Sequence, residues 1–308
     1  MKILGKSFVL LQTAIVFALL AGTPMISYAA QQEVFTSPEQ AGNALIDANR
    51  NGNKEDELLK ILGPEAADLI HSGDPVADKN AQKMFVTSYE AGHVWESDGD
   101  NKKILVVGNN KWPLPIPLVR EGDKWRFDAK TGRQEILNRR IGRNELNVIK
   151  VCRSYVEAQE DYAKEYPGQH EYAQNFKSTP GKHDGLYWPV VKGEEESPLG
   201  ALMASAEAEG YKTISGKEKH TPYHGYYFRI LRMQTAAAHG GAKDYITKGR
   251  MTAGFALLAY PAKYGDSGIK TFIVNQTGIV HEKDLGPETA SIASQITKYD
   301  PDKTWQTP

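Results

Sequence analysis

Residues 144–166 read NELNVIKVCRSYVEAQEDYAKEY, and this is the most strongly periodic stretch of the chain. Six of its residues recur at spacings of three and four, the period that places residues on one face of a helix. They are Val148, Cys152, Tyr155, Gln159, Tyr162 and Tyr166. Pro167-Gly168 ends the pattern. We therefore predict a helix over residues 144–166, with a domain junction just before it, at Ile141-Gly142.

Beyond this helix, the apolar residues no longer follow a helical period. A loop-rich stretch over residues 167–198 precedes Ser197-Pro198, which we interpret as the N-cap and first residue of a short helix that ends at Gly210. Strand-like runs follow at residues 225–233, 251–260, 270–275 and 279–283, with glycines at the intervening turns. This order predicts one long helix packed on an antiparallel sheet.

The chain before the long helix begins with helical signals. Ser37 is an expected N-cap with Gln40 three residues later, as in a capping box. Helices are predicted from there to residue 50, over residues 58–62 and over residues 75–91, and strands over residues 103–108 and 124–128. Residues 112–119 alternate proline with apolar residues; because proline cannot donate to a β-ladder, an edge strand or extended segment is expected there.

Helices followed by antiparallel strands in each half give an α+β fold class. We expect two antiparallel-sheet-plus-helix units, one in an N-terminal domain over residues 30–142 and one in a C-terminal domain over residues 143–308. The first 29 residues differ from both domains in composition.

This N-terminal segment has the layout of a secretory signal peptide. Lys2 and Lys6 are its only charges, an apolar run follows over residues 7–22, and small residues at 27 and 29 fit a cleavage site. Cleavage after Ala29 fits best, and cleavage after Ala30 is the alternative. An uncleaved anchor is disfavoured because the apolar run is short for a membrane span of about 20 residues. No cysteine lies near the site to carry a lipid.

Composition excludes several functional classes. The 308 residues carry a formal net charge of −1, with 40% apolar and 24% charged residues, which is typical of a globular protein. Removing the first 29 residues leaves 279 and takes away two lysines, so the formal charge becomes −3. The chain has no excess of basic residues, so its composition gives no indication of nucleic-acid binding. The single cysteine, Cys152, excludes an intramolecular disulfide and an all-cysteine metal site. Its place in the helical pattern predicts a buried, unreactive thiol.

One dense polar and aromatic cluster stands out, at residues 183–188. A carboxylate beside a histidine, Asp184 after His183, could support general acid–base catalysis, with Arg250 binding an anion. The alternative is a turn at Asp184-Gly185 whose aromatic neighbours fill the core. Aromatic side chains also dominate protein-binding surfaces, so four residues are candidates for one: Tyr187, Trp188, Tyr226 and Tyr227.

Metal and cofactor signals are weak in this sequence. Residues 47–53 match the first half of a calcium-binding EF-hand loop, but Leu58 occupies the position that needs a bidentate carboxylate. No spaced zinc motif accompanies the histidines of the second half. We therefore assign no metal ligand and no cofactor, and keep a metal-binding protein as an alternative.

Taken together, the motifs of the chain resemble the bacterial domain of unknown function 2950 family over nearly all of the mature residues. The resemblance implies an exported envelope protein and carries over no activity or catalytic residue. His239 and Tyr260 stand where the family pattern is expected to hold Pro and Trp. The matching stretches include Ser72-Gly73-Asp74-Pro75, Trp125-Arg126-Phe127-Asp128, Arg140-Ile141-Gly142-Arg143-Asn144-Glu145, Asp184-Gly185-Leu186-Tyr187-Trp188, Tyr223-His224-Gly225-Tyr226 and Gly254-Phe255-Ala256-Leu257.

Two shorter resemblances concern the fold of each half. The hairpin around residues 118–128 is similar to the sheet of cystatin-like or nuclear-transport-factor-2-like domains. The strands from Leu258 to Val280 are similar to the headgroup sheet of type IV pilin-like and pseudopilin-like proteins, without the hydrophobic assembly helix of a pilin.

These observations lead to three hypotheses about function. The first is a periplasmic or secreted, non-catalytic module that binds or assembles with an envelope protein or polymer, with no membrane span after signal cleavage and no nucleic-acid partner. The second is a hydrolase or lyase that acts on an envelope substrate through Asp184 and His183. The third is a metal-binding periplasmic protein.

Overall fold

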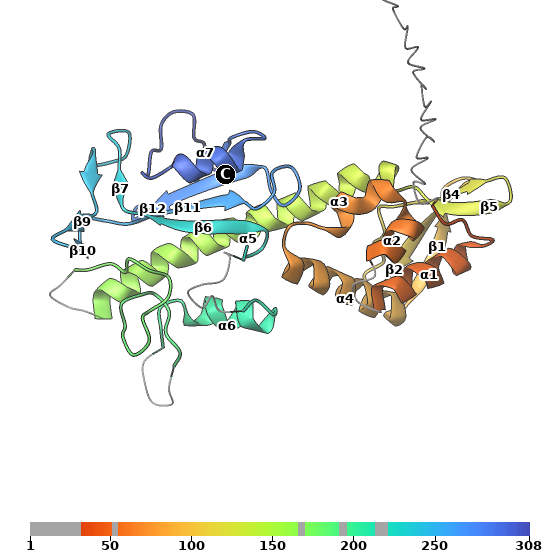
Figure 1. Ribbon diagram of the computed structural model, residues 1–308, viewed down its shortest axis with the longest axis horizontal. Helices are drawn as coiled ribbons and strands as arrows, with labels where there is room; N and C mark the ends of the chain where they lie inside the picture. The colour runs from red at the N-terminus through yellow and green to blue at the C-terminus, as the bar shows by residue number, and fades with distance from the viewer. Residues whose placement is uncertain (1–31, 51–54, 166–169, 191–195, 213–220) are drawn as a thin grey trace, which may run out of the picture.

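The computed structural model describes residues 32–50, 55–165, 170–190, 196–212 and 221–308. The predicted signal peptide, the predicted cleavage site and the loop of the partial EF-hand motif beyond residue 50 lie outside these ranges. Figure 1 shows one long helix, α5 (Ala129–Glu165), that crosses the molecule and joins two groups of helices and strands.

The first group, called here the N-terminal module, contains four α-helices: α1 (Pro38–Arg50), α2 (Glu55–Leu62), α3 (Ala67–Ile70) and α4 (Pro75–Ala91). The predicted Ser37 cap is confirmed at α1, because the Ser37 hydroxyl accepts the Gln40 N–H at 3.2 Å. The Gln40 side chain accepts the N–H of Thr36 at 2.8 Å instead of that of Ser37. The predicted start of α4 is also confirmed, with Asp74 as its N-cap and Pro75 in its first turn.

The sheet of the N-terminal module is antiparallel, with the strand order β1-β2-β4-β5 and β3 paired to β2. Prolines divide the predicted extended segment 112–119 into two short strands with a gap between them, because a proline cannot donate to the ladder. The module's core contains Phe35, Leu105, Leu118, Phe127 and Tyr89. The strands are β1 (His93–Ser97), β2 (Lys102–Val107), β3 (Trp112–Pro113), β4 (Leu118–Glu121) and β5 (Lys124–Phe127).

The C-terminal module has a four-stranded antiparallel sheet in the order β13-β12-β11-β6. The predicted strand over residues 251–260 is divided, because Gly254 adopts a positive φ of 136° between the two strands. The elements of this module are α6 (Gly200–Ala208), β6 (Tyr226–Leu231), β7 (Met233–Gln234), β8 (Lys243–Asp244), β9 (Ile246–Thr247), β10 (Arg250–Met251), β11 (Ala256–Pro261), β12 (Lys270–Asn275), β13 (His281–Asp284) and α7 (Thr289–Gln295).

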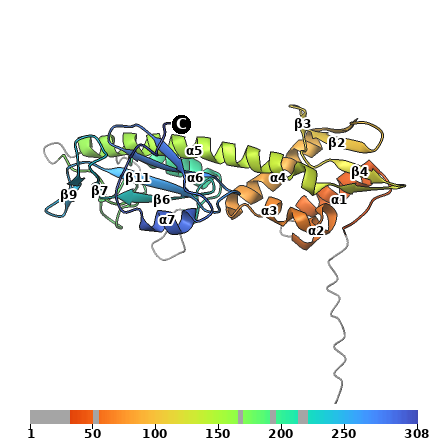
Figure 2. The same ribbon diagram turned by 90° about the horizontal axis from the view of Figure 1, so that it is seen from above.

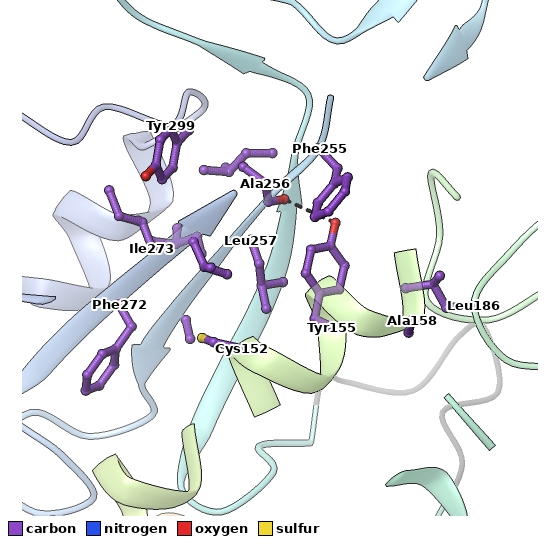
Figure 3. Close-up of a cluster of buried hydrophobic side chains, with 14 of the residues drawn as sticks. Cys152, Tyr155, Ala158, Leu186, Phe255, Ala256, Leu257, Phe272, Ile273 and Tyr299 are labelled. Atoms are coloured by element: carbon purple, nitrogen blue, oxygen red, sulfur yellow. Dashed lines mark hydrogen bonds between the residues drawn. The ribbon is translucent and has the colours of Figure 1, made fainter. Parts of the chain in front are cut away.

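The core of the C-terminal module forms where α5 packs on this sheet. Cys152 and Tyr155 of the helix face Leu257 of the sheet, and Ala158 lies nearer Leu186 (Figure 3). The Tyr155 hydroxyl donates to the Ala256 carbonyl at 3.3 Å, the contact dashed in Figure 3. Burial raises the pKa of the Cys152 thiol to about 12, so the thiolate is not formed near neutral pH. The prediction of a buried, unreactive cysteine is confirmed.

The long helix begins earlier than the sequence pattern indicates. It spans 37 residues, or about 55 Å at 1.5 Å per residue, and it continues through Ile141-Gly142, where we expected a junction. Two separate cores flank that position: one includes Ala129 at the start of the helix, and the other begins at Val148. Two units remain our interpretation, but the chain connects them through a continuous helix.

Helices and antiparallel sheets occur in both modules, so the α+β fold class is confirmed. Within the described ranges, no helix is both long enough and apolar enough to cross a membrane.

The first turn of α5 reaches the N-terminal module through a glycine. A Cβ atom on Gly132 would lie 2.5 Å from the Pro115 carbonyl oxygen and 2.8 Å from Ile116 Cα, whereas one on Gly142 would meet nothing within 4 Å. The helix can approach the segment between β3 and β4 only because position 132 lacks a side chain.

We expect Gly132→Ala to destabilise the protein by about 1–3 kcal/mol, because the added methyl group overpacks a contact with backbone atoms. Gly142→Ala is the matched control on the same helix and should stabilise the protein by up to about 1 kcal/mol through helix propensity. Urea denaturation followed by circular dichroism measures both. Equal effects of the two substitutions would contradict the close approach at Gly132.

Candidate functional site

The predicted catalytic pair lies in a loop in which both side chains have structural partners. The His183 ring stacks on Trp188, with 4.1 Å between ring centroids and 10° between planes. The Asp184 carboxylate accepts the Thr179 N–H at 2.7 Å and the Thr179 hydroxyl at 2.8 Å. These hydrogen bonds from Thr179 lower the pKa of Asp184, so it is ionised at neutral pH rather than ready to donate a proton.

The loop is also closed tightly on itself. Gly185 is buried, and a Cβ atom there would lie 2.6 Å from the carbonyl carbon of Lys177. The Ser178 hydroxyl accepts the Gly185 N–H at 3.0 Å and faces its carbonyl at 3.2 Å. The second interpretation of this cluster, a turn whose aromatic neighbours fill the core, describes its observed geometry.

Arg250 lies on the short strand β10, where its guanidinium contacts the Glu171 carboxylate at 2.7 Å. This ion pair joins β10 to the segment after α5, and backbone hydrogen bonding between Tyr172 and Met251 continues the same connection. The anion-binding role predicted for Arg250 therefore competes with an existing carboxylate partner.

The four predicted binding residues divide by burial. Trp188 and Tyr226 are core residues, with 4% and 0% of their surfaces exposed, so neither is available to a partner in this structure. Burial raises the pKa of Tyr226, whose hydroxyl donates to the Lys270 carbonyl at 2.9 Å. Tyr187 and Tyr227 are half-buried, and the Tyr227 ring lies 5.6 Å from that of Tyr260. A binding role for these two stays a prediction.

Several polar residues from distant motifs instead meet where the two modules touch, a contact that we call the seam and define by Asp74, Arg140, Asn144, Tyr211, Gly225 and Asp266. Asp74 is completely buried. Its Oδ1 accepts the N–H groups of Val76 and Ala77 at 3.1 Å each, and its Oδ2 accepts the Tyr211 hydroxyl at 2.8 Å and the Gly225 N–H at 2.9 Å. One carboxylate therefore caps α4 and connects it to the C-terminal module.

Arg140 makes the second connection across the seam. It projects from the middle of α5, pairs with the buried carboxylate of Asp266, and donates to the carbonyls of Asp68 at 3.2 Å and Leu69 at 2.6 Å. Lys263 extends the cluster, with its Nζ 2.7 Å from Asp266 and 3.6 Å from Asp68. The pKa of Asp68 is lowered, first by the hydrogen bond from Arg133 and then by the charge of Lys263.

The next turn of α5 holds a loop of the C-terminal module. The Asn144 amide donates to the Ser267 carbonyl at 2.8 Å, and Glu145 Oε1 accepts the N–H groups of Ile269 at 3.0 Å and Lys270 at 2.9 Å. Together with Arg140, these residues form the motif 140–145, whose polar side chains hold the modules on the helix.

A cavity of about 360 Å³ lies next to the seam, between α2, the end of α3 and the first turns of α4. His71 Nε2 lies 2.9 Å from Glu55 Oε1 at its rim, and both side chains are about half exposed. Asp78 lies in the wall of this cavity, and burial is the main cause that raises its pKa. The cavity is lined by Glu55, Leu58, Ile70, His71, Gly73, Pro75, Asp78, Lys79 and Gln82.

Neither this cavity nor its carboxylates can be predicted from the sequence. In the stretch Ser72-Gly73-Asp74-Pro75, an acidic residue before proline is an ordinary helix start, and nothing local indicates a cavity. Among the described residues, no group of three or more His, Cys, Asp or Glu side chains could hold a metal ion.

This architecture defines a two-module α+β protein whose modules are held by one helix and a polar seam. The chain belongs to the family described as Protein of unknown function (DUF2950), whose model matches residues 32–307. No curated protein and no solved structure matches the chain. The similarities to cystatin-like, nuclear-transport-factor-2-like and pilin-like folds are therefore unconfirmed.

The seam makes a strong prediction for Asp74. Asp74→Ala removes the α4 cap and leaves the Tyr211 hydroxyl and the Gly225 N–H as buried donors without their acceptor. We expect it to destabilise the protein by about 3 kcal/mol or more. Tyr211→Phe removes the donor to Asp74 and the acceptor of the His224 N–H, and should cost about 1–2 kcal/mol.

The control is Asp123→Ala, because the Asp123 side chain is fully exposed in the turn between β4 and β5; it should change stability by less than about 0.5 kcal/mol. Thermal denaturation measures all three variants. Similar midpoints for Asp74→Ala and Asp123→Ala would contradict the role assigned to the seam.

Proposed function

We propose that this protein is exported to the periplasm or secreted, and that it acts there as a non-catalytic module that binds an envelope protein or a cell-envelope polymer. The observation that carries the proposal is the use of polar motif residues as structural contacts. Asp74 and Arg140 join the modules, Asn144 holds a loop of the C-terminal module on α5, and Asp184 closes a loop on Thr179. A protein built to hold two modules in a fixed relation suits recognition of a partner better than turnover of a substrate.

The export part of the proposal rests on the N-terminal sequence. The charged start, the apolar run and the small residues before position 30 are the three parts of a secretory signal. The mature start after Ala29 leaves two residues before the first described residue, Gln32, so cleavage would leave both modules intact.

The hydrolase or lyase alternative is not favoured by a specific observation. General acid–base partners must both reach one substrate, but the cavity described above is lined by residues of the N-terminal module, and both His183 and Asp184 have structural partners within their own loop. The metal-binding alternative likewise gains no support from the described side chains.

Expression of the full chain in a bacterial host tests export. We expect the purified protein to begin at Ala30 and to be recovered in the periplasmic fraction, whereas deletion of residues 2–29 should leave it in the cytoplasm. N-terminal sequencing and fractionation measure this outcome. A cytoplasmic full-length product that retains Met1 would contradict the proposal.

Sedimentation with purified peptidoglycan sacculi tests polymer binding, and chemical cross-linking in envelope extract tests protein binding. We expect the wild-type protein to be retained in at least one assay and Tyr187→Ala or Tyr227→Ala to reduce retention several-fold, because aromatic side chains contribute much of a typical interface. Tyr264→Ala, another half-buried tyrosine of the same module, is the control. No retention of the wild type in either assay would contradict the binding role. Unchanged retention of both folded variants would contradict the surface.

A further inference from the structure

The cavity between α2 and α4 combines an apolar wall with polar groups at its rim. Leu58 is almost fully buried beneath it, and Ile70 and Pro75 add apolar surface. Its volume of about 360 Å³ lies at the lower end of the range for small-ligand sites, about 300–1,000 Å³. The cavity therefore has the size and lining for a compact organic molecule rather than for a single ion.

The first turn of α4 would ordinarily favour an anion, because the free N–H groups of a helix start carry partial positive charge. That capacity is already used here. Asp74 accepts the N–H groups of Val76 and Ala77, and its own carboxylate is buried away from the cavity in the seam. The helix start consequently offers little to an anionic ligand.

The charged side chains of the cavity favour a cation instead. Glu55 and Asp78 supply two carboxylates, and Lys79 supplies one permanent positive charge. His71 already contacts Glu55 and is charged only when protonated. Lys79 is exposed, so it can turn toward solvent.

Asp78 is the group best placed to bind that cation. Its two carboxylate oxygens share the N–H of Ser72, at 3.1 and 3.3 Å, although an ionised carboxylate can accept about four hydrogen bonds. Burial raises the pKa of Asp78 more than hydrogen bonding from the Ser72 side chain and backbone lowers it. The charge of Arg140 lowers this pKa less, and Arg140 is committed to Asp266 and to two backbone carbonyls. The ionised form of Asp78 is therefore poorly compensated, and a ligand with N–H donors and a positive charge would supply what it lacks.

We propose that the cavity between α2 and α4 binds a small organic ammonium compound, with its ammonium group on Asp78 and Glu55 and its apolar stem against Leu58 and Ile70. This site goes beyond the proposed binding function, because it gives the protein a small-molecule ligand at a second place. It does not depend on the partner surface at Tyr187 and Tyr227.

Titration with hexylamine tests the proposal, with hexan-1-ol and hexanoate as neutral and anionic probes of similar size. We expect the exported protein to bind hexylamine saturably in isothermal titration calorimetry and to bind hexanol and hexanoate at least ten-fold more weakly. Asp78→Asn should weaken hexylamine binding at least ten-fold, and Glu55→Gln should weaken it less. Asp56→Asn, an exposed neighbour on α2 outside the cavity lining, should leave binding unchanged.

A gain-of-binding variant covers the case in which Asp78→Asn does not fold. Gln82→Glu adds a carboxylate to the cavity lining and should tighten hexylamine binding about three-fold or more. The proposal is overturned if hexylamine shows no saturable binding, if hexanol binds equally well, or if the Asp78 and Gln82 variants that fold bind like the wild type. Failure of the sacculus and cross-linking assays would leave this result untouched, so the two proposals fail separately.

Discussion

Helix α5 is the constraint on which the rest of the structure depends, because it is a core element of both modules. From Leu137 to Tyr162 its buried residues recur mostly at spacings of three and four, which keeps them on one side of the helix, and Ala129 and Gly132 are buried at its start. A continuous helix fixes the rise and rotation between any two of its residues. The modules are therefore not free to choose their relative orientation, and both must pack on positions set by the same rod, as Figure 2 shows from above.

A helix alone, however, contacts each module over a few turns only, and the seam supplies the connections beside it. The buried charges there have partners: Arg140 is paired with Asp266, and Asp74 accepts hydrogen bonds from both modules. Buried ion pairs add little net stability compared with apolar packing, but the loss of one partner is costly. Such contacts favour one arrangement over its alternatives more than they add stability. That explains why charged side chains, which could take part in catalysis elsewhere, occur here without lining a cleft.

The sequence predicted those parts of the fold that local patterns determine. The second half of α5, the cap of α1, the extent of α4 and the turn between β4 and β5 follow from spacing, capping residues and turn residues. The first half of α5 could not be predicted, since residues 129–143 contain Gly132, Gly142 and several arginines and only a sparse apolar pattern. Gly132 weakens the helix locally by about 1 kcal/mol relative to alanine. A glycine is needed there because the Pro115 backbone, which is distant in sequence, approaches the helix closely. The cluster at residues 183–188 was correctly singled out, but whether its polar groups face a substrate or the loop itself depends on Thr179 and Trp188 in three dimensions.

Asp74 and Asp78 show most clearly where inference from sequence ends. They lie about one helical turn apart at the start of α4: Asp74 precedes Pro75 as the N-cap and Asp78 lies within the helix. Neither position shows in the sequence which carboxylate a distant segment will bury. Tyr211 and Gly225, 137 and 151 residues away, take up one carboxylate and bury it. Among the described residues of the C-terminal module, no comparable donor reaches Asp78, which lines a cavity with Ser72 as its partner. The difference between a structural and a ligand-facing carboxylate is therefore created by long-range contacts, and only the folded chain can assign the two roles.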